Sequence, residues 1–392
     1  MSYSLQKNLP QLPPLGGQGL DVAIIGGGLA GLCVAIQLVK QGFKIILFEK
    51  ETYPFHKVCG EYISMESWSF LESLGLPLGK MQLPVIKKLI VTSPDGNALQ
   101  HDLPLGGFGI SRYKIDTDLK EIALGLGVHV LENCKAEEVI FKDETFFINT
   151  TKGDFNAKVC CGSFGKRSNL DVKWKRPFTQ PSKSKLSNFI GIKYHIKIDF
   201  AADTIALHNF KNGYCGISKI EDNKYCLCYL TNAANLKECN NSIDEMEKNI
   251  LSRNPFLKNI FKTATRLYSS PLSISQISFQ QKTQVENHML LLGDAAGMIT
   301  PLCGNGMSMA MHGSKIAAES ITPFLKNGIS RTSMEKDYVR NWNKTFAKRL
   351  STGRIVQYFF GKMSVTNLSV KLMKRLPFIT TKIIKQTHGN PF

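Results

Sequence analysis

The first clear pattern along the chain is an uninterrupted apolar run, followed by glycines and then by helical periodicity. Residues 22–25 are all apolar, as in a parallel strand that is buried on both faces. From residue 29 to residue 41 apolar positions recur at helical spacing. A second strand pattern, residues 44–48, follows Gly42 and is apolar from residue 45 onward. This order of strand, glycine turn, helix and strand predicts the opening unit of a doubly wound α/β sheet.

The glycines between the first strand and the helix have the spacing Gly-x-Gly-x-x-Gly. Gly26 allows a tight turn, Gly28 allows the backbone to approach a pyrophosphate, and Gly31 allows the helix to pack on the strand. Glu49 ends the second strand about 20 residues later, where an acid can bind ribose hydroxyls. The alternative is an ordinary turn with a solvated glutamate. The complete order of elements favours a dinucleotide site.

Residues 22–39 could also be taken for a membrane span, because they carry no charge and match the shortest spanning helices in length. Four glycines within them lower helix propensity, and only the dinucleotide interpretation explains the glycine spacing. The run also begins too late for a signal peptide, behind an irregular Pro-rich lead-in at residues 1–19. We therefore expect a protein of the reducing cytoplasm.

Alternation, turn residues and helix caps predict the elements that follow. Strands are expected at residues 86–92 and 98–103 (a hairpin around Pro94-Asp95-Gly96-Asn97), 128–131, 136–141, 145–150, 159–168 (ending in a turn), 189–198, 204–210, 214–220, 224–230 and 289–292. Helices are expected from a cap at Ser64 to Gly75, from a cap at Asp116 to about Gly125, and at 243–252, 307–325 and beyond 331.

These elements predict an α/β protein with a Rossmann-type nucleotide-binding domain. The nucleotide-binding domain is expected to be split, over residues 20–168 and 281–330, because the buried strand 289–292 follows a β-rich stretch. The β-rich stretch, residues 169–280, is predicted to be an inserted substrate domain. Residues 331–392 are predicted to form a basic helical C-terminal region.

The charge of the chain is unusual, since its 392 residues carry a net charge of +18. Residues 331–392 hold thirteen lysines and arginines against two acidic residues, so this segment carries eleven of those charges. Leu368, Leu372 and Leu376 interleave with basic residues there, as on an amphipathic helix. We expect either solvated lysines or docking to an acidic acyl carrier protein or anionic membrane, which would place the protein at the inner membrane face. Nucleic acid is disfavoured, because no recognised binding motif accompanies the charge.

The ten cysteines are scattered without paired Cys-x-x-Cys motifs, so neither a metal site nor a disulfide framework is predicted. Cys226 and Cys228 alternate within a strand pattern, where buried thiols are the expected arrangement. The sequence also offers no paired carboxylates and no Ser/His/Asp arrangement for hydrolysis.

Three motifs in order resemble the flavoprotein family of geranylgeranyl reductases, aromatic-hydroxylase-type monooxygenases and flavin halogenases. The first is the opening glycine unit with Glu49. The second, Arg112-x-x-x-Asp116-x-x-Leu119, is similar to the segment that meets the FAD phosphates. The third, Gly293-Asp294-Ala295-Ala296 with Pro301-x-x-Gly304-x-Gly306-Met307, is similar to the second FAD motif. The resemblance covers roughly residues 20–330.

This resemblance implies an oxidoreductase with non-covalently bound FAD, and it leaves open whether NAD(P)H or another reductant is the electron donor. The carboxylate of Asp294, just past a buried strand, can accept hydrogen bonds from ribityl hydroxyls, whereas a helix N-cap is the alternative. The residues implied to bind the cofactor are Gly26, Gly28, Leu29, Ala30, Gly31, Glu49, Lys50, Cys59, Gly60, Arg112, Ala136, Asp294, Pro301, Gly304, Asn305, Gly306 and Met307.

The sequence indicates the cofactor more clearly than it indicates the type of reaction. Lys57-Val58-Cys59-Gly60 resembles a Cys-Gly loop beside the flavin in geranylgeranyl reductases, which makes Cys59 the candidate catalytic residue, with an inert buried thiol as the alternative. Ser163-Phe164-Gly165 lacks the aspartate of family monooxygenases that is linked to pyridine nucleotides, and residues 213–217 lack the halogenase tryptophans. We therefore favour a C=C reductase acting on a hydrophobic, carrier- or lipid-linked substrate. A monooxygenase (hydroxylase) is the alternative, and a halogenase or a non-catalytic nucleic-acid-binding protein ranks lower.

Overall fold

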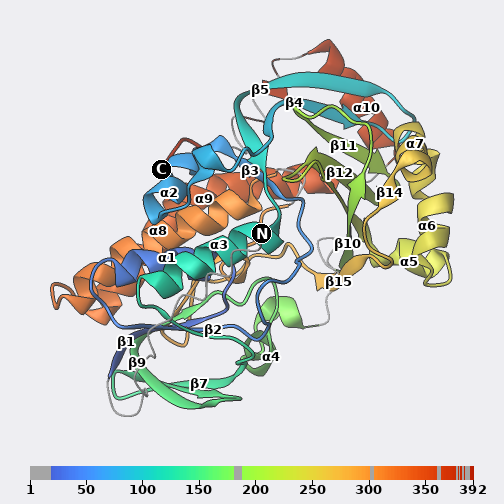
Figure 1. The fold of residues 1–392 in the computed structure, drawn as a ribbon. Coiled ribbons are helices and arrows are strands. Elements are labelled where there is room, and N and C mark those ends of the chain that lie inside the picture. The colour runs from blue at the N-terminus through green and yellow to red at the C-terminus, as the bar shows by residue number, and fades with distance from the viewer. Residues whose placement is uncertain are drawn as a thin grey trace.

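The computed structural model shows two β-sheets with helices packed around them (Figure 1). It describes residues 19–180, 188–300, 304–359, 363–376, 378, 380–381, 384 and 389–392. The irregular lead-in expected at residues 1–19 therefore lies almost wholly outside the described residues. No helix within the described part of the chain is long and apolar enough to cross a membrane.

The first sheet is built around β1, which pairs in parallel with β2 on one side and with β9 on the other. Its eight strands, among the described residues, are β16 (Val285–Glu286), β17 (Met289–Leu291), β9 (Gly153–Gly162), β1 (Leu20–Ile25), β2 (Ile45–Phe48) and β6 (His129–Leu131) in spatial order, with β7 (Ala136–Lys142) and β8 (Thr145–Thr150) pairing beside β9. The parallel order of β17, β9, β1, β2 and β6 confirms the α/β prediction for this half.

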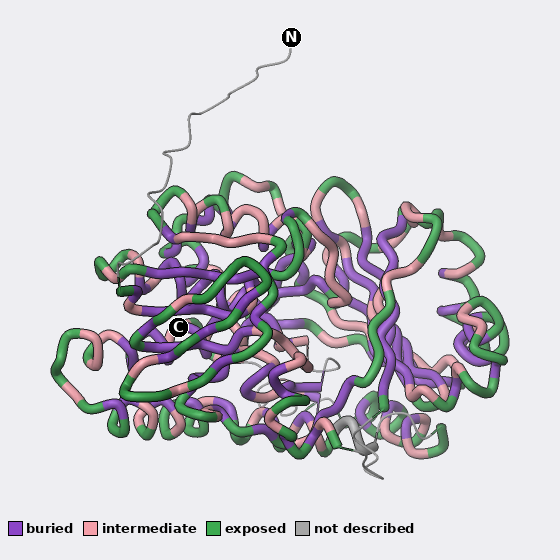
Figure 2. Tube along the Cα trace, turned by 90° about the horizontal axis from the view of Figure 1, so that it is seen from below, coloured by how far each residue is buried: buried purple, intermediate pink, exposed green. Residues whose placement is uncertain are grey.

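The apolar positions of the central strands are buried, because helices pack on the sheet. Val22, Ala23 and Ile24 of β1 are completely buried, and Figure 2 shows the buried residues, in purple, gathered in the middle of the molecule. Helix α1 (Leu29–Val39) packs against α8 (Gly306–Leu325), so segments from before and after the β-rich stretch share one core.

The second sheet is larger and mostly antiparallel, and its strands are almost fully buried on both faces around β10 and β13. Its nine strands, within the described ranges, are β14 (Thr265–Arg266), β10 (Phe189–Lys197), β13 (Tyr225–Asn232), β12 (Gly213–Lys219), β11 (Thr204–Phe210), β4 (Val85–Thr92), β5 (Ala98–Gly109) and β3 (Tyr62–Ser64) in spatial order, with β15 (Leu272–Ile277) paired to β10.

The second sheet includes strands that the sequence analysis assigned to the nucleotide-binding domain. The expected hairpin of β4 and β5 does form, with Thr92 opposite Ala98. However, β4 pairs in parallel with β11, so β3, β4 and β5 belong to the second sheet although they lie within residues 20–168. Pairing between strands more than a hundred residues apart leaves no local signal, which is why the sequence pattern assigned them to the first domain.

The helices lie where the patterns predicted them, with three additions in the β-rich region. Their bounds are α2 (Trp68–Leu74), α3 (Arg112–Gly125), α4 (Asn169–Lys173), α5 (Ala233–Glu238), α6 (Ile243–Asn249), α7 (Pro255–Thr263), α9 (Arg331–Phe359) and α10 (Met363–Arg375). The long helix α9 is part of the main hydrophobic core and not a separate C-terminal extension. Its side chains Tyr338, Trp342 and Phe346 are buried in the core that also contains the first sheet. Helix α10 lies apart from it, over β4 and β5 (Figure 1).

The predicted start of one helix is wrong. Helix α3 begins at Arg112, and the side chain of Ser111, not of Asp116, caps it by accepting a hydrogen bond from the backbone N–H of Lys114 (3.1 Å). Serine and aspartate are both good N-caps. Asp116 is instead turned into the interior by ion pairs with two basic side chains, which only the tertiary structure could show.

Candidate active site

A cavity of about 1250 Å³ is lined by residues from both sheets. This volume exceeds the 300–1,000 Å³ that is usual for a site holding one small molecule. One part of its wall is polar and contains the glycine turn after β1, and another part is apolar and is formed by strands of the second sheet. The cavity can therefore hold a cofactor and a hydrophobic substrate side by side.

The glycine turn forms one wall of the cavity as the sequence predicted. Gly26 has a φ of +104°, and Gly31 lies so close to the carbonyl of Gly26 that a side chain at either position would collide with backbone. The carboxylate of Glu49 accepts a hydrogen bond from the backbone N–H of Gly27 (2.9 Å). These contacts hold the N-terminus of α1, with its partial positive charge, toward the cavity.

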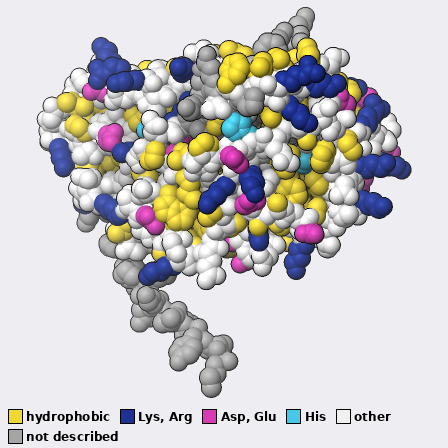
Figure 3. Space-filling view, turned by 90° about the horizontal axis from the view of Figure 1, so that it is seen from above, with side chains coloured by type: hydrophobic (Ala, Val, Ile, Leu, Met, Phe, Trp, Pro, Cys, Tyr) yellow, Lys and Arg dark blue, Asp and Glu magenta, His cyan; other side chains and the backbone are white. Residues whose placement is uncertain are grey.

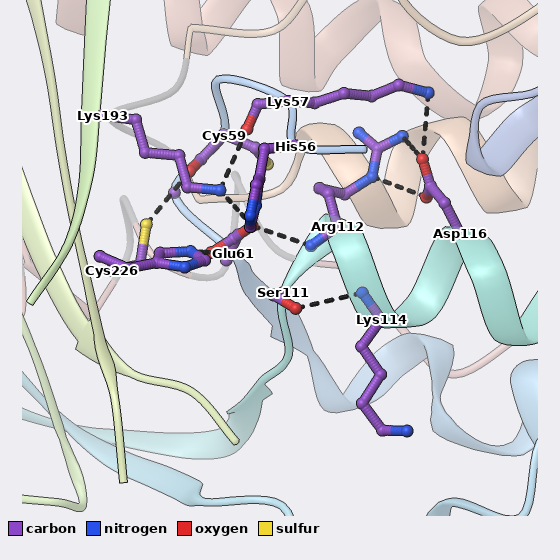
Figure 4. A network of polar contacts seen from close by, with 12 residues as sticks. His56, Lys57, Cys59, Glu61, Ser111, Arg112, Lys114, Asp116, Lys193 and Cys226 are labelled. Carbon is purple, nitrogen blue, oxygen red and sulfur yellow. Dashed lines mark hydrogen bonds and ion pairs between the residues drawn. The ribbon is translucent and has the colours of Figure 1, made fainter. Parts of the chain in front are cut away.

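Two basic side chains face the open side of this turn. Arg112 forms a two-point ion pair with Asp116 (2.8 and 2.7 Å), and the same carboxylate accepts from Lys57 Nζ at 3.0 Å (Figure 4). A Cβ built on Gly28 would lie 3.5 Å from Arg112 Nη2 and 3.7 Å from Lys57 Nζ. Burial opposes ionisation of Asp116, but Arg112 and Lys57 lower its pKa below the usual range. Two fixed cations and the N-terminus of α1 thus lie around the position that a side chain at Gly28 would occupy.

A second cluster of charges lies at the end of β17. Asp294 lines the cavity, and burial raises its pKa above the usual range although Lys282, Arg112 and Lys166 oppose this. Lys282 Nζ donates to the backbone carbonyls of Lys166 and Asp294, both at 2.7 Å. Lys166 also lines the cavity, and its Nζ is buried without a hydrogen-bond partner among the described residues. An unsatisfied ammonium at a cavity wall calls for an anionic ligand group.

The structure brings most of the predicted cofactor residues to one cavity. Those that line it are Gly26, Gly28, Leu29, Ala30, Glu49, Lys50, Cys59, Gly60, Arg112, Ala136, Asp294, Gly304, Gly306 and Met307. Gly31 and Asn305 lie behind the wall, and Pro301 lies outside the described residues. The glycine turn, the paired cations and the unsatisfied Lys166 suit an elongated dinucleotide that carries a pyrophosphate, so the residues present fit FAD.

The Cys59 loop adjoins a buried polar network that the sequence did not reveal. Cys59 is half-buried on the cavity wall, and Cys226 Sγ donates to its carbonyl at 3.2 Å. Glu61, completely buried, binds the side chains of Lys193 and His195 (Figure 4). The available signal was the pattern of β10, where a lysine and a histidine stand two positions apart in an otherwise apolar strand and so share one face.

The apolar part of the cavity is formed by the second sheet, and Met373 of α10 also lines it. Its wall contains Leu89, Val91, Leu99, Leu103, Ile205, Leu207, Leu230, Ile274, Ile277 and Met373. Val370 and Met373 of α10 pack on Val91 and Leu99 of the β4–β5 hairpin. The same helix therefore contributes to the cavity with one face while its other face points outward.

Comparisons with known proteins agree with this geometry. A family profile described as FAD dependent oxidoreductase matches residues 21–57. The chain is 24% identical over 386 residues to conditioned medium factor receptor 1 of Dictyostelium discoideum, covering 88% of this chain and 71% of that protein. It is 23% identical over 389 residues to digeranylgeranylglycerophospholipid reductase of Methanospirillum hungatei, covering 93% and 92%. Among solved structures, the flavin-dependent brominase Bmp2 matches with a TM-score of 0.76 at 20% identity, over 94% of this chain and 93% of that one.

The three sequence motifs predicted an FAD-dependent oxidoreductase, and the family match over the glycine turn and Glu49 and the relatives over most of the chain agree with that class. The relatives and structural neighbours include reductases, halogenases and monooxygenases, so they define the class of enzyme but not the reaction.

Proposed function

We propose that this protein reduces a C=C bond in a hydrophobic, lipid-linked substrate. The observation that supports this most directly is the shape of the cavity, which runs from the glycine turn to the apolar wall of the second sheet and has Cys59 on its surface. Long apolar substrates need such an apolar compartment, and a reaction that transfers hydride needs protection from water.

The residues of the polar part would hold FAD by the pyrophosphate and the ribityl chain. The N-terminus of α1, Arg112 and Lys57 face the phosphate space, while Asp294 and Lys166 stand beside it. When bound and reduced, FAD supplies a hydride to one carbon of the double bond. The protein must then exclude water, orient the substrate and give one proton to the other carbon.

Cys59 is the group proposed to give that proton. Burial raises the pKa of its thiol, which keeps it protonated at neutral pH, as a donor must be. The loop that carries it is anchored on both sides, because the carbonyl of Cys59 accepts from Cys226 on β13 and that of Lys57 accepts from Lys193 on β10 (3.1 Å). These two backbone contacts support a fixed position for the loop that carries Cys59 on the cavity wall.

The outer face of α10 supports a lipid-linked substrate over a carrier-linked one. Leu368, Leu372 and Leu376 are 68%, 47% and 36% exposed, while Thr366, Val370 and Met373 on the other face are buried. Lysines and arginines surround these leucines, and basic and apolar side chains lie interspersed on the face of the molecule shown in Figure 3. Exposed leucines flanked by basic residues suit an anionic bilayer, because the leucines can insert while the basic residues attract the lipid headgroups. Binding of an acidic carrier protein would require the basic residues but would not require exposed leucines.

The proposed reaction can be tested with purified protein that retains FAD. The flavin is photoreduced without oxygen, and a C20 polyprenyl alcohol in detergent is added, in one sample without O2 and in a second sample together with O2. We expect the lipid to reoxidise the flavin and to be recovered with two additional hydrogen atoms. Failure of the lipid to oxidise the flavin, together with an oxygenated lipid product when O2 is present, would instead establish a monooxygenase.

A further inference from the structure

The hydroxyl of Tyr62 is buried in the cavity wall and lacks a hydrogen-bond partner. Tyr62 is the first residue of β3, the edge strand of the second sheet, where this sheet contacts α8 (Figure 1). Its side chain is 5% exposed and lines the cavity, and its oxygen makes no hydrogen bond within the described part of the chain. Leaving a buried hydroxyl unsatisfied costs free energy, so such a group in a cavity wall indicates a missing ligand atom.

Two glycines make room for the ring of Tyr62 and restrict its movement. A Cβ built on Gly107 of β5 would lie 2.3 and 2.4 Å from Cε2 and Cζ of the ring. At the opposite edge of the ring, a Cβ on Gly304 would lie 3.4 and 3.5 Å from Cδ1 and Cε1. Gly304 belongs to the loop that resembles the second FAD motif. Tyr62 therefore stands between this loop and the apolar part of the cavity.

The side chains packed with Tyr62 are apolar. They are Ile86, Leu103, Ile205, Leu89 and Ile384. Leu89 also packs on the neighbouring cluster, which contains Met373 of α10. Because Leu89 joins the two clusters, one apolar wall runs from Tyr62 to α10, and the ring hydroxyl stands at one end of it.

A second unsatisfied hydroxyl belongs to the same wall. Thr380 is 4% exposed and lines the cavity, and its Oγ1 has no hydrogen-bond partner among the residues that the structure describes. It lies four positions before Ile384, which packs with Tyr62, and both positions are helical. Isolated hydroxyls on an apolar wall suit a ligand that is apolar over most of its length and carries few polar atoms.

The charges around Tyr62 favour a neutral ligand atom over a phosphate. Within the described ranges, the strands of the second sheet contribute no charged residue to the cavity lining. A phosphate is normally bound by cations, and this wall offers none. Burial, followed by the charge of Glu66, raises the pKa of Tyr62, so its hydroxyl stays protonated and can donate. Glu66 itself pairs with Arg349 at 3.5 Å, and its oxygens make no hydrogen bond with Tyr62.

We propose that Tyr62 is a specificity-determining residue whose hydroxyl binds a neutral oxygen of the substrate, either an alcohol or an ether. This assignment rests on the proposed reduction of a lipid and adds the polar atom by which the lipid is recognised. The oxygen end of the lipid lies beside the loop of Gly304, and its hydrocarbon chain follows the apolar wall toward Met373. A lipid that carries a diphosphate in place of the neutral oxygen is disfavoured.

Binding of two lipids to two proteins tests the assignment. Tyr62→Phe removes the hydroxyl and keeps the ring, and a C20 polyprenyl alcohol is compared with the hydrocarbon that lacks its oxygen. A scintillation proximity assay with tritiated lipids in detergent gives each Kd. Partition into detergent cancels, because each lipid is compared with itself on the two proteins. We expect Tyr62→Phe to weaken binding of the alcohol roughly tenfold and to leave binding of the hydrocarbon unchanged. An equal change for both lipids, or no change for the alcohol, would overturn the proposal.

Tyr229→Phe is the matched control for the binding assay. Tyr229 also lines the cavity, but its hydroxyl already donates to Oε1 of Glu247 at 2.8 Å. Its replacement should affect the alcohol and the hydrocarbon equally. The C20 polyprenyl diphosphate should bind wild-type protein more weakly than the alcohol. Tighter binding of the diphosphate, unaffected by Tyr62→Phe, would show a phosphate site and refute the neutral subsite.

Thermal unfolding of the lipid-free protein gives an independent measurement. Tyr62→Phe removes an unsatisfied hydroxyl, so its Tm should be unchanged or higher than that of wild type. Tyr229→Phe should lower the Tm, because it breaks a hydrogen bond to a buried carboxylate. A lower Tm for Tyr62→Phe would show that this hydroxyl has a partner in the free protein, and the proposal would fall.

The binding results also separate the subsite from the reaction. If wild-type protein binds the alcohol through Tyr62 and does not reduce it, the proposed function fails and the subsite stands. If wild-type protein reduces the lipid while Tyr62→Phe binds the alcohol with unchanged Kd, the subsite fails and the proposed function stands.

Discussion

The guanidinium of Arg112 is held by the carboxylate of Asp116 through two hydrogen bonds of 2.8 and 2.7 Å, one helical turn apart on α3. Because Lys57 binds the same carboxylate, a single buried acid fixes two cations beside the glycine turn. The remaining hydrogen-bond donors of these cations are available to a ligand. We therefore expect an anion at this site to meet a preformed arrangement of cations and not flexible surface lysines.

Replacing Gly28 with valine should abolish FAD binding without unfolding the protein. A Cβ at this position meets only the ends of Arg112 and Lys57 at ordinary contact distances, so the side chain fits the apo-protein but occupies the phosphate space. Gly125→Val at the open end of α3 is the control, because nothing lies near its Cβ. FAD fluorescence titration measures the loss, and acid denaturation of wild type should release all flavin from the polypeptide. Equal FAD affinity of the two variants would contradict the placement.

Lys166→Met should weaken FAD binding and stabilise the apo-protein. Burial lowers the pKa of Lys166 to about 7, so the empty site carries an unfavourable ammonium that an anionic ligand would satisfy. A hydrogen bond to a charged group contributes about 1.5–3 kcal/mol, so we expect roughly a tenfold to hundredfold weaker Kd. The apo Tm should rise. Lys152→Met, at an exposed position, serves as the control and should change neither quantity.

The FAD affinity of wild type should also depend on pH with a definite sign. A bound phosphate raises the pKa of Lys166 above its value of about 7 in the empty site. The contribution of the Lys166 ammonium to FAD affinity is fully present below about pH 7. It is lost as the pH rises through the higher pKa of the complex, and Kd then weakens by up to about tenfold per pH unit. Isothermal titration between pH 6 and 9 measures this slope, which Lys166→Met should remove. A slope that persists in the variant would place the titrating group elsewhere.

Cys59→Ala should keep FAD but lose substrate-driven flavin reoxidation, and Cys59→Ser should retain more of it. Serine keeps the size and a transferable proton, whereas alanine removes the proton. Cys228→Ala and Cys228→Ser provide matched controls, because Cys228 also lines the cavity but lies on β13. Stopped-flow absorbance after photoreduction follows each variant. Equal turnover of Cys59→Ala and Cys59→Ser would remove the proton role from the thiol.

Leu368→Asp combined with Leu372→Asp should eliminate binding to vesicles of phosphatidylglycerol. These two side chains lie one turn apart on the outer face of α10, where aspartate would oppose both insertion and charge attraction. Ile140→Asp, at an exposed apolar position on β7, is the control. Vesicle sedimentation at two salt concentrations gives the measurement, with neutral vesicles as a further comparison. If the wild-type protein binds an acyl carrier protein and does not bind the vesicles, the outer face of α10 is a carrier-binding surface and the membrane prediction is wrong.

Arg176→Met should destabilise the fold by about 3–5 kcal/mol, because it leaves a buried acid without its partner. Arg176 and Asp171 are both almost fully enclosed and lie 2.7 Å apart, and Arg176 also donates to the carbonyl of Ala295 beside Asp294 (3.1 Å). The exposed pair of Arg340 and Asp337, 2.8 Å apart, offers the comparison. Arg340→Met should cost less than about 1 kcal/mol in urea unfolding. Similar losses in the two variants would contradict the burial argument.

The sequence by itself determined the opening unit of the fold and the cofactor class. Apolar runs, Gly26-x-Gly28-x-x-Gly31 and Glu49 lie within one continuous segment, and local chain geometry alone dictates a strand, a glycine turn and a helix there. The β4–β5 hairpin, the caps at Ser64 and Gly75 and the strands of residues 189–230 were likewise predictable, since each depends on residues close in sequence.

Only the tertiary structure decided which distant segments meet. The pairing of β4 with β11, the inward turn of Asp116 and the contact of Glu61 with Lys193 and His195 all join residues that no spacing rule connects. A buried charge is stable only with a partner, and the partner's position depends on the packing of whole sheets. For this reason local patterns located the nucleotide turn, whereas the network of Glu61, Lys193 and His195 depends on how β10 meets the loop before β3.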